Sequence, residues 1–137
     1  MAEEGKIGFE LVSPEQLLMS EDVEMVLVPG VEGDFGVLAR HAPLISSLRP
    51  GVVGICRKGR QPEERYFVAG GFAEVTGERC TVLAEYPIEV STMDRGEVEQ
   101  ELKNAREDLA DAKDDKERGA AERRIAVSEA KLRALAA

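Results

Sequence analysis

Proline and glycine are distributed very unevenly along this chain of 137 residues. All six prolines and eleven of the thirteen glycines precede residue 90, and only Gly96 and Gly119 follow it. Proline interrupts both helices and sheet ladders, and glycine favours turns. The first part must therefore fold as short segments joined by turns, whereas the second part is free to form long helices. We predict two domains, residues 1–88 and residues 89–137.

The first part shows the alternation of apolar and polar residues that is typical of strands with one buried face. Two strands are predicted to bury alternate side chains, namely Ile7, Phe9 and Leu11 in one and Val23, Met25 and Leu27 in the other. Further strands are expected at residues 52–57, 65–69, 72–76 and 80–84. Short strands separated by proline and glycine turns at this spacing predict a β-sandwich or a barrel.

The second part carries two narrow apolar stripes at helical spacing. The first stripe comprises Val98, Leu102, Ala105, Leu109 and Ala112, and the second comprises Ile125, Ser128, Leu132 and Leu135. Neither stripe continues between Lys113 and Gly119, and a short loop there favours antiparallel neighbours. Residues 94–117 carry a net charge of −5 and residues 118–137 a net charge of +3, which favours pairing of the helices. Two roles remain open for this hairpin, a cap on the β domain and a detachable arm that binds partners.

Composition excludes several classes of partner. The net charge of −9 argues against nucleic acid, because phosphate binding needs a basic face, and against a polybasic membrane contact. The N-terminal residues are acidic and lead into no apolar run, so we expect no signal peptide and no membrane span. A cytosolic protein, or one held at a membrane only through partners, is therefore predicted.

No pattern of catalytic or metal-binding residues stands out. The single histidine, His41, has no nucleophile pattern beside it, and Cys56 and Cys80 lack the paired spacing of a zinc site. The glycine-rich segment from Pro29 to Gly36 lacks the Gly-Lys-Ser/Thr ending of a phosphate loop, and its charged residues are acidic. We predict no catalytic residue, no metal and no cofactor, and we interpret this segment as turns or as a partner-facing loop.

The run from Pro29 to Leu44, PGVEGDFGVLARHAPL, resembles the signature stretch of the epsilon chain of rotary F-type ATP synthase. Further matching stretches follow in the order of that family, at Leu48–Gly51, Phe67–Val75 and Val82–Ala84, before the alanine-rich hairpin. The resemblance spans nearly the whole chain. It implies a β + α fold, with a flattened β-sandwich of about ten strands followed by an antiparallel two-helix hairpin.

The resemblance also implies a noncatalytic role in the central rotor. The sandwich of an epsilon chain attaches to the gamma chain and to the membrane ring of c subunits, and so helps couple proton transport to ATP synthesis. The implied location is the cytoplasmic face of the bacterial inner membrane, reached only through the complex. The family's ring-facing region aligns with the segment from Glu32 to Pro43. The implied interface residues are Glu32, Asp34, Phe35, His41 and Pro43.

In bacterial members of this family the hairpin can extend into the catalytic head and hinder ATP hydrolysis. Basic residues of the second helix then face an acidic segment of the beta chain, and the candidates here are Arg118, Arg123, Arg124, Lys131 and Arg133. Some members bind ATP through an Ile/Leu-Asp-x-x-Arg-Ala motif. In the corresponding stretch here, Met93 to Val98, Glu97 replaces the arginine. We expect weak or absent ATP binding, because a carboxylate repels phosphate.

Two rival functions share the composition but not the ordered signature. A generic adaptor would combine a sandwich with a coiled-coil arm, and a small β-sandwich enzyme would need an active site that includes His41. Co-purification with a gamma chain argues against the adaptor, whereas turnover by the isolated chain would favour the enzyme.

Overall fold

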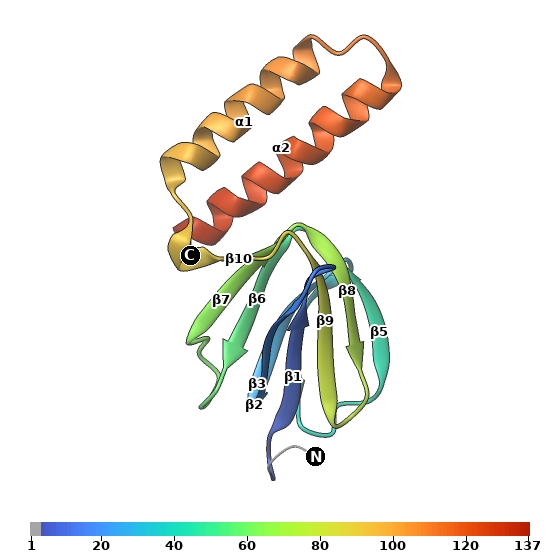
Figure 1. The fold of residues 1–137 in the computed structure, drawn as a ribbon, viewed down its shortest axis with the longest axis vertical. Coiled ribbons are helices and arrows are strands. Elements are labelled where there is room, and N and C mark those ends of the chain that lie inside the picture. The colour runs from blue at the N-terminus through green and yellow to red at the C-terminus, as the bar shows by residue number, and fades with distance from the viewer. Residues whose placement is uncertain (1–3) are drawn as a thin grey trace. The chain divides into compact units, whose positions relative to one another are not determined.

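The computed structural model describes residues 4–137, which form two compact units. The first unit ends at Glu89 and contains all the strands, and the second unit runs from Val90 to Ala137 and contains the helices (Figure 1). The predicted order of a β domain followed by a helical hairpin is confirmed.

Ten strands form one sheet that curls into a sandwich (Figure 1). The strands are β1 (Ile7–Val12), β2 (Leu17–Val23), β3 (Met25–Gly30), β4 (Gly33–Leu38), β5 (Leu44–Leu48), β6 (Gly51–Cys56), β7 (Glu64–Val68), β8 (Gly70–Val75), β9 (Arg79–Glu85) and β10 (Ile88–Glu89). Their order is β10-β7-β6-β3-β5-β8-β9-β1-β2, with β4 paired to β3. The pair β1–β9 is parallel and the other pairs are antiparallel.

The core of the sandwich confirms one predicted alternation and corrects part of the other. Ile7, Phe9 and Leu11 are fully buried in β1, as predicted. In the second alternation Val23 and Met25 are buried as predicted but Leu27 is not, because residues 23–27 belong to two strands rather than one. Strand β2 ends at Val23, β3 begins at Met25, and the alternation changes phase after Met25. Val26 and Val28 therefore lie in the core, whereas Leu27 is half-exposed.

The segment from residue 29 to residue 36 is a β-hairpin rather than a loop. Strand β4 pairs with β3 along its whole length, and the turn falls at Val31 and Glu32. Glycine interrupts the alternation of apolar and polar residues in this segment. Gly30 nevertheless suits the structure, because a Cβ there would lie only 2.8 Å from the carbonyl oxygen of Gly33. Of the two interpretations of this segment, the turn is confirmed, and strand β4 beside it was not predicted. That the turn faces a partner stays a prediction.

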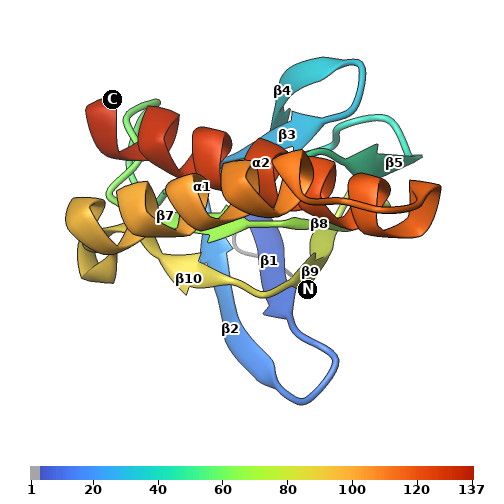
Figure 2. The ribbon, with the colours of Figure 1, turned by 90° about the horizontal axis from the view of Figure 1, so that it is seen from above.

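The second unit consists of a short 3-10 helix, η1 (Val90–Thr92), and two α-helices, α1 (Arg95–Ala110) and α2 (Asp115–Ala136). The helices lie side by side (Figure 2). Asp94 caps α1 by accepting a hydrogen bond from the Gly96 amide, and Asp114 caps α2 by accepting one from the Glu117 amide. The break between the helices thus precedes the predicted one, and Gly119 lies inside α2.

The buried positions of the hairpin carry mostly small side chains. On α1, Val98, Leu102 and Ala105 are buried as predicted, whereas Leu109 is only partly buried. On α2, Ser128 is buried as predicted and Ala121 is buried too, but Ile125 is partly exposed. No helix within residues 4–137 combines the length and apolar character needed to cross a membrane.

Candidate interaction surfaces

The two predicted carboxylates of the β3–β4 hairpin, Glu32 and Asp34, differ in their contacts. Glu32 is exposed at the turn. Asp34, on β4, forms an ion pair with Arg49 across a distance of 2.5 Å between Oδ1 and Nη2. The Nη1 of Arg49 also donates to the carbonyl oxygen of Gly30 at 2.7 Å. The ion pair between Asp34 and Arg49 thus stabilises the hairpin. Of Glu32 and Asp34, Glu32 is the carboxylate that is open to a partner.

The environment of Phe35 indicates a structural role rather than an exposed contact. Its side chain is partly buried and packs against the hydrophobic core of the sandwich. A Cβ at Gly30 would meet the Phe35 ring at 2.9 Å, so the ring lies directly over that glycine. Phe35 therefore holds the β3–β4 hairpin against the core.

His41 and Pro43 lie in the loop between β4 and β5, at the opposite end of β4 from Glu32. The six residues of β4 separate these ends by about 20 Å. The Arg40 amide donates to the carbonyl oxygen of Gly77 at 2.9 Å, which fixes the loop beside the β8–β9 turn. The predicted interface residues thus form two separate clusters, one at each end of the sandwich.

A band of exposed apolar side chains crosses the outer face of the sandwich and was not predicted. Phe72 on β8 is 53% exposed and lies opposite Leu83 on β9, which is 51% exposed. On the other side of Leu83, the register places Val12 of β1 opposite it, and Val12 pairs in turn with the exposed Leu17 of β2. Ile45 of β5 is 74% exposed. We call Leu17, Ile45, Phe72 and Leu83 the apolar band.

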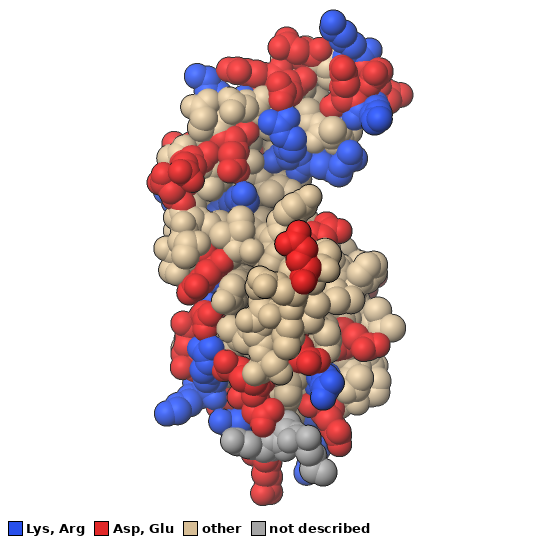
Figure 3. Space-filling view, viewed as in Figure 1, with Lys and Arg blue, Asp and Glu red and all other residues tan. Residues whose placement is uncertain are grey.

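The space-filling view shows that the surface over β8 and β9 is mostly uncharged (Figure 3). Exposed apolar residues scattered singly are ordinary, but residues gathered on adjacent strands indicate a contact surface. The sequence contained a signal for two of them. Ala73 and Val75 are buried in β8, and Cys80, Val82 and Ala84 are buried in β9, so Phe72 and Leu83 are out of phase with the buried positions. An apolar residue out of phase in an alternating strand points outward.

The predicted basic residues of the hairpin fall into two groups. Arg124 pairs with Asp108 at 2.5 Å and Lys131 pairs with Glu101 at 3.2 Å, in both cases across the two helices. A third pair across the helices, Arg106 with Glu129 at 3.5 Å, runs in the opposite sense. Acidic and basic groups on the two helices therefore do meet, as the charge distribution indicated.

The remaining three predicted cations do not cross between the helices. Arg118 pairs with Asp115 within the first turn of α2. In the part of the chain that the structure describes, Arg123 and Arg133 form no ion pair, and both are exposed. These two arginines are the basic groups that the closed hairpin leaves open to a partner.

The start of α1, where weak or absent ATP binding is predicted, is acidic. The Asp94 side chain accepts the Gly96 amide at 3.2 Å, so the cap occupies a donor that a phosphate would need. Glu97 lies in the first turn of the helix and adds a second carboxylate. Both features are unfavourable for an anionic ligand at this helix end.

The chemically reactive side chains are buried or isolated. Cys56 and Cys80 are both free thiols without exposed surface, and burial raises the pKa of the Cys80 thiol to about 12. Burial and the nearby carboxylates of Glu63 and Glu24 also raise the pKa of Cys56. Residues 4–137 contain no group of three or more histidine, cysteine or acidic side chains placed to hold a metal ion.

Two family models together match nearly the whole chain. Residues 6–89 match the model of the β-sandwich domain of the ATP synthase delta/epsilon chain. Residues 94–137 match the model of the C-terminal domain of the ATP synthase epsilon chain.

Similar proteins and structures agree with these models. The ATP synthase epsilon chain of Paramagnetospirillum magneticum is 52% identical over 131 residues, covering 96% of this chain and 98% of the relative. The epsilon chain of Rhodospirillum rubrum is 49% identical over 126 residues, covering 92% and 93%. A chain of the Euglena gracilis mitochondrial ATP synthase OSCP/F1/c-ring structure has the same fold, with a TM-score of 0.85 at 23% identity over 96% of this chain and 82% of that one. A chain of the Tetrahymena thermophila central stalk/c-ring structure matches with a TM-score of 0.68 at 14% identity, covering 98% and 99%.

Proposed function

Because this chain belongs to the ATP synthase epsilon chain family, we propose that it links the gamma chain to the membrane c-ring as a noncatalytic part of the rotor. In this role it couples proton transport through the membrane sector to ATP synthesis in the catalytic head. It is held at the cytoplasmic face of the bacterial inner membrane by the complex. The similar chains from the central stalk/c-ring and F1/c-ring assemblies support this proposal.

The apolar band is the observation that supports the proposed attachment to the gamma chain. Phe72 and Leu83 each expose about half of their surface on directly paired strands. Burying such side chains in a partner contributes about 25 cal/mol for each Å² removed from water, and aromatic residues dominate interface energies. We therefore place the gamma chain on this face. His41 and Pro43 lie in the loop fixed beside the β8–β9 turn, and we assign them to the same partner.

Charge substitution within the band tests this assignment. The double variant Phe72→Asp/Leu83→Lys is expected to lose co-purification with the gamma chain of the same organism when the two are co-expressed. Because both side chains point to solvent, circular dichroism of the isolated variant should match the unchanged chain. Gln61→Lys, in an exposed loop, is the matched control and should retain the gamma chain. Retention of the gamma chain by the double variant would contradict the assignment.

For the c-ring we propose the β3–β4 turn, with Glu32 as the carboxylate that meets basic or polar groups of the ring loops. Asp34 acts indirectly, because its ion pair with Arg49 holds the turn in place. Phe35 likewise supports the turn from the core side. Glu32→Lys should weaken assembly with the ring and coupled ATP synthesis. An unchanged synthesis rate would exclude the turn as the ring contact.

For the hairpin we propose an arm that binds the acidic segment of the beta chain when it is extended. Arg123 and Arg133 are open to that partner in the closed hairpin, whereas Arg118, Arg124 and Lys131 must first leave their intramolecular carboxylates. Removal of residues 91–137 should leave the complex assembled, because the sandwich carries both attachment surfaces. ATP hydrolysis by the assembled complex should rise on truncation. Equal hydrolysis before and after truncation would refute a braking role.

A further inference from the structure

A groove of about 610 Å³ lies at one end of the sandwich, between the β1–β2 turn and the segment that follows β9. Pro14, Glu15 and Leu18 line one side, and Glu85, Tyr86 and Pro87 line the other. All of these residues belong to the sandwich unit. None of them was among the predicted interface residues.

Backbone hydrogen bonds hold both walls of the groove. In the β1–β2 turn, the Ser13 amide donates to the carbonyl oxygen of Gln16 at 2.9 Å, and the Ser13 hydroxyl bonds back to the same residue. On the opposite wall the Ala69 amide donates to the carbonyl oxygen of Glu85 at 2.9 Å. A proline in each wall further restricts the backbone. A groove formed in advance binds a partner with little ordering cost.

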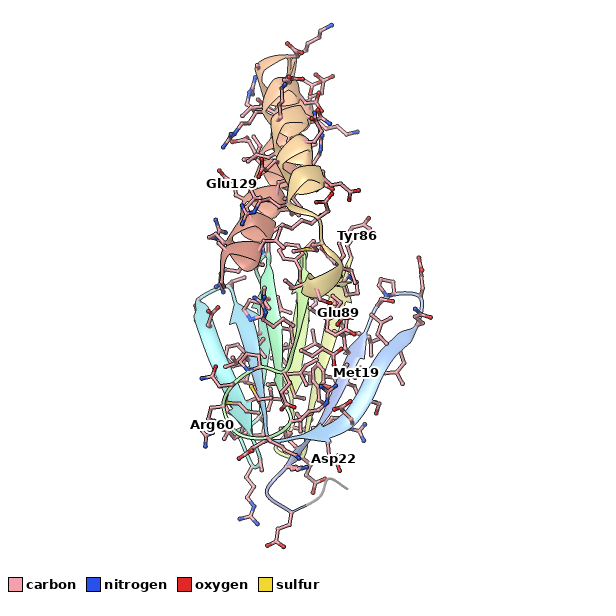
Figure 4. All side chains as sticks on the ribbon, turned by 90° about the vertical axis from the view of Figure 1, so that its left-hand side faces the viewer. Met19, Asp22, Arg60, Tyr86, Glu89 and Glu129 are labelled. Carbon is pink, nitrogen blue, oxygen red and sulfur yellow. The ribbon has the colours of Figure 1, made fainter. Side chains whose placement is uncertain are left out.

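Tyr86 is the exposed aromatic residue of this groove. Its side chain is 80% exposed, and its φ of 48° lies in the left-handed region that costs a non-glycine residue about 1 kcal/mol or more. Figure 4 labels Tyr86 where the chain leaves β9. Folding gains little from an aromatic ring in solvent on a strained backbone. Binding gains more, because tyrosine is enriched among the residues that dominate interface energies.

The charges around the groove select its ligand. Glu15 and Glu85 line it and are both exposed, and none of the described residues that line it is a lysine or an arginine. An arginine side chain complements such a site. Its stem packs on proline and leucine, its planar guanidinium stacks on the tyrosine ring, and its donors reach carboxylates in pairs.

We propose that this groove receives an arginine side chain of the gamma chain, with Tyr86 as the stacking residue and Glu15 and Glu85 as its ion-pair partners. The proposal rests on the proposed function, because the groove continues the apolar band. Leu17 of the band lies between Gln16 and Leu18 in the β1–β2 segment, and Leu83 precedes Glu85 by two residues on the same face of β9. A gamma chain seated on the band therefore reaches the groove.

Affinity between the full chain and the gamma chain of the same organism tests the proposal. Tyr86→Asn removes the ring but keeps a residue that tolerates the left-handed conformation, and Tyr86→Phe keeps the ring. We expect the first variant to weaken binding about tenfold or more and the second to bind like the unchanged chain. The charge variant is Glu15→Gln/Glu85→Gln. It should weaken binding at low salt and flatten the dependence of Kd on sodium chloride.

Glu122→Gln is the matched control, because Glu122 is exposed on α2, outside the sandwich surfaces that we assign to the gamma chain. It should leave both the Kd and its salt dependence unchanged. Wild-type affinity in Tyr86→Asn, or an unchanged salt dependence in the charge variant, would overturn the proposal while leaving the proposed function intact. Failure of the unchanged chain to bind the gamma chain would instead refute both. The charge variant decides the question if Tyr86→Asn does not fold.

Discussion

Replacement of Gly71 by alanine should disrupt the sandwich more than any other single methyl addition at its glycines. Gly71 forms the second pair of the β8–β9 ladder and has a φ of 131°, in a region that favours glycine. A Cβ there would lie 1.9 Å from the carbonyl oxygen of Leu83, whereas real Cβ atoms essentially never come within 3.0 Å of a neighbour. The obstructing atom belongs to the backbone, so no side-chain rotation relieves the clash. Strands β8 and β9 must move apart by about 1 Å, in an interior that is otherwise close-packed.

The cost has two parts that can be separated. The left-handed backbone alone costs alanine about 1–3 kcal/mol. Separating the strands adds the loss of two or three ladder hydrogen bonds, at about 1 kcal/mol each. The expected total of about 3–6 kcal/mol is a large part of the 5–15 kcal/mol that stabilises an ordinary domain.

Gly33→Ala isolates the first part, because Gly33 has a φ of 137° but its added Cβ would meet nothing within 4 Å. Urea unfolding followed by tyrosine fluorescence measures both variants. Both tyrosines, Tyr66 and Tyr86, belong to the sandwich, and the chain has no tryptophan, so the signal does not include the hairpin. Gly71→Ala should be at least about 2 kcal/mol less stable than Gly33→Ala. Equal stability of the two variants would refute the reasoning about the clash.

Three further predictions concern the thiols, a phenol and the hairpin. Because burial raises the pKa of Cys80 to about 12 and encloses both thiols, a thiol reagent at pH 8 should label neither cysteine in the folded chain and both in urea, as counted by mass spectrometry. Burial and then the hydrogen bond with Glu64 raise the pKa of Tyr66 to about 12. The folded state therefore favours the protonated phenol, so this stabilisation is complete below about pH 10 and is lost as the pH rises through 12. Absorbance titration of the Tyr86→Phe variant measures the ionisation of Tyr66 alone. Arg124→Ala should lower the stability of the hairpin by less than about 1 kcal/mol in far-ultraviolet circular dichroism melts, since exposed ion pairs contribute little, and a larger loss would show that the Asp108 pair is structural.

The fold and the family could be predicted because each rests on residues that are close in sequence. The confinement of proline to the first part separates strands from helices, and the ordered glycine and proline signature identifies the epsilon family, which both family models confirm. The errors arose where glycine or a strand junction breaks the alternation. Gly33 and Gly36 concealed β4, and beyond the strand junction at Glu24 the phase of β3 differs from the prediction after Met25.

The candidate surfaces were harder to predict because they depend on register across strands that are distant in sequence. Nothing local to Phe72 shows that it lies opposite Leu83, and nothing local to Asp34 shows that Arg49 engages it. The segment from Glu32 to Pro43 looked like one site because it is continuous in sequence. Strand β4 divides it into two ends of the sandwich. Which of these residues touch a partner stays a prediction.

The parallel pairing of β1 with β9 has a consequence for how the protein is made. Strand β1 pairs with β2 directly after it in the chain, but Gly8 through Val12 find their second partner strand only in Arg79 through Leu83, about seventy residues later. During synthesis the β1–β2 pair must therefore wait with the other edge of β1 unpaired until β9 has been translated, and such exposed strand edges are prone to aggregation. The hairpin, by contrast, makes its contacts between neighbouring helices and can form as soon as it is complete. A chaperone, or an early encounter with a partner subunit, would therefore protect the newly made sandwich more than the newly made hairpin.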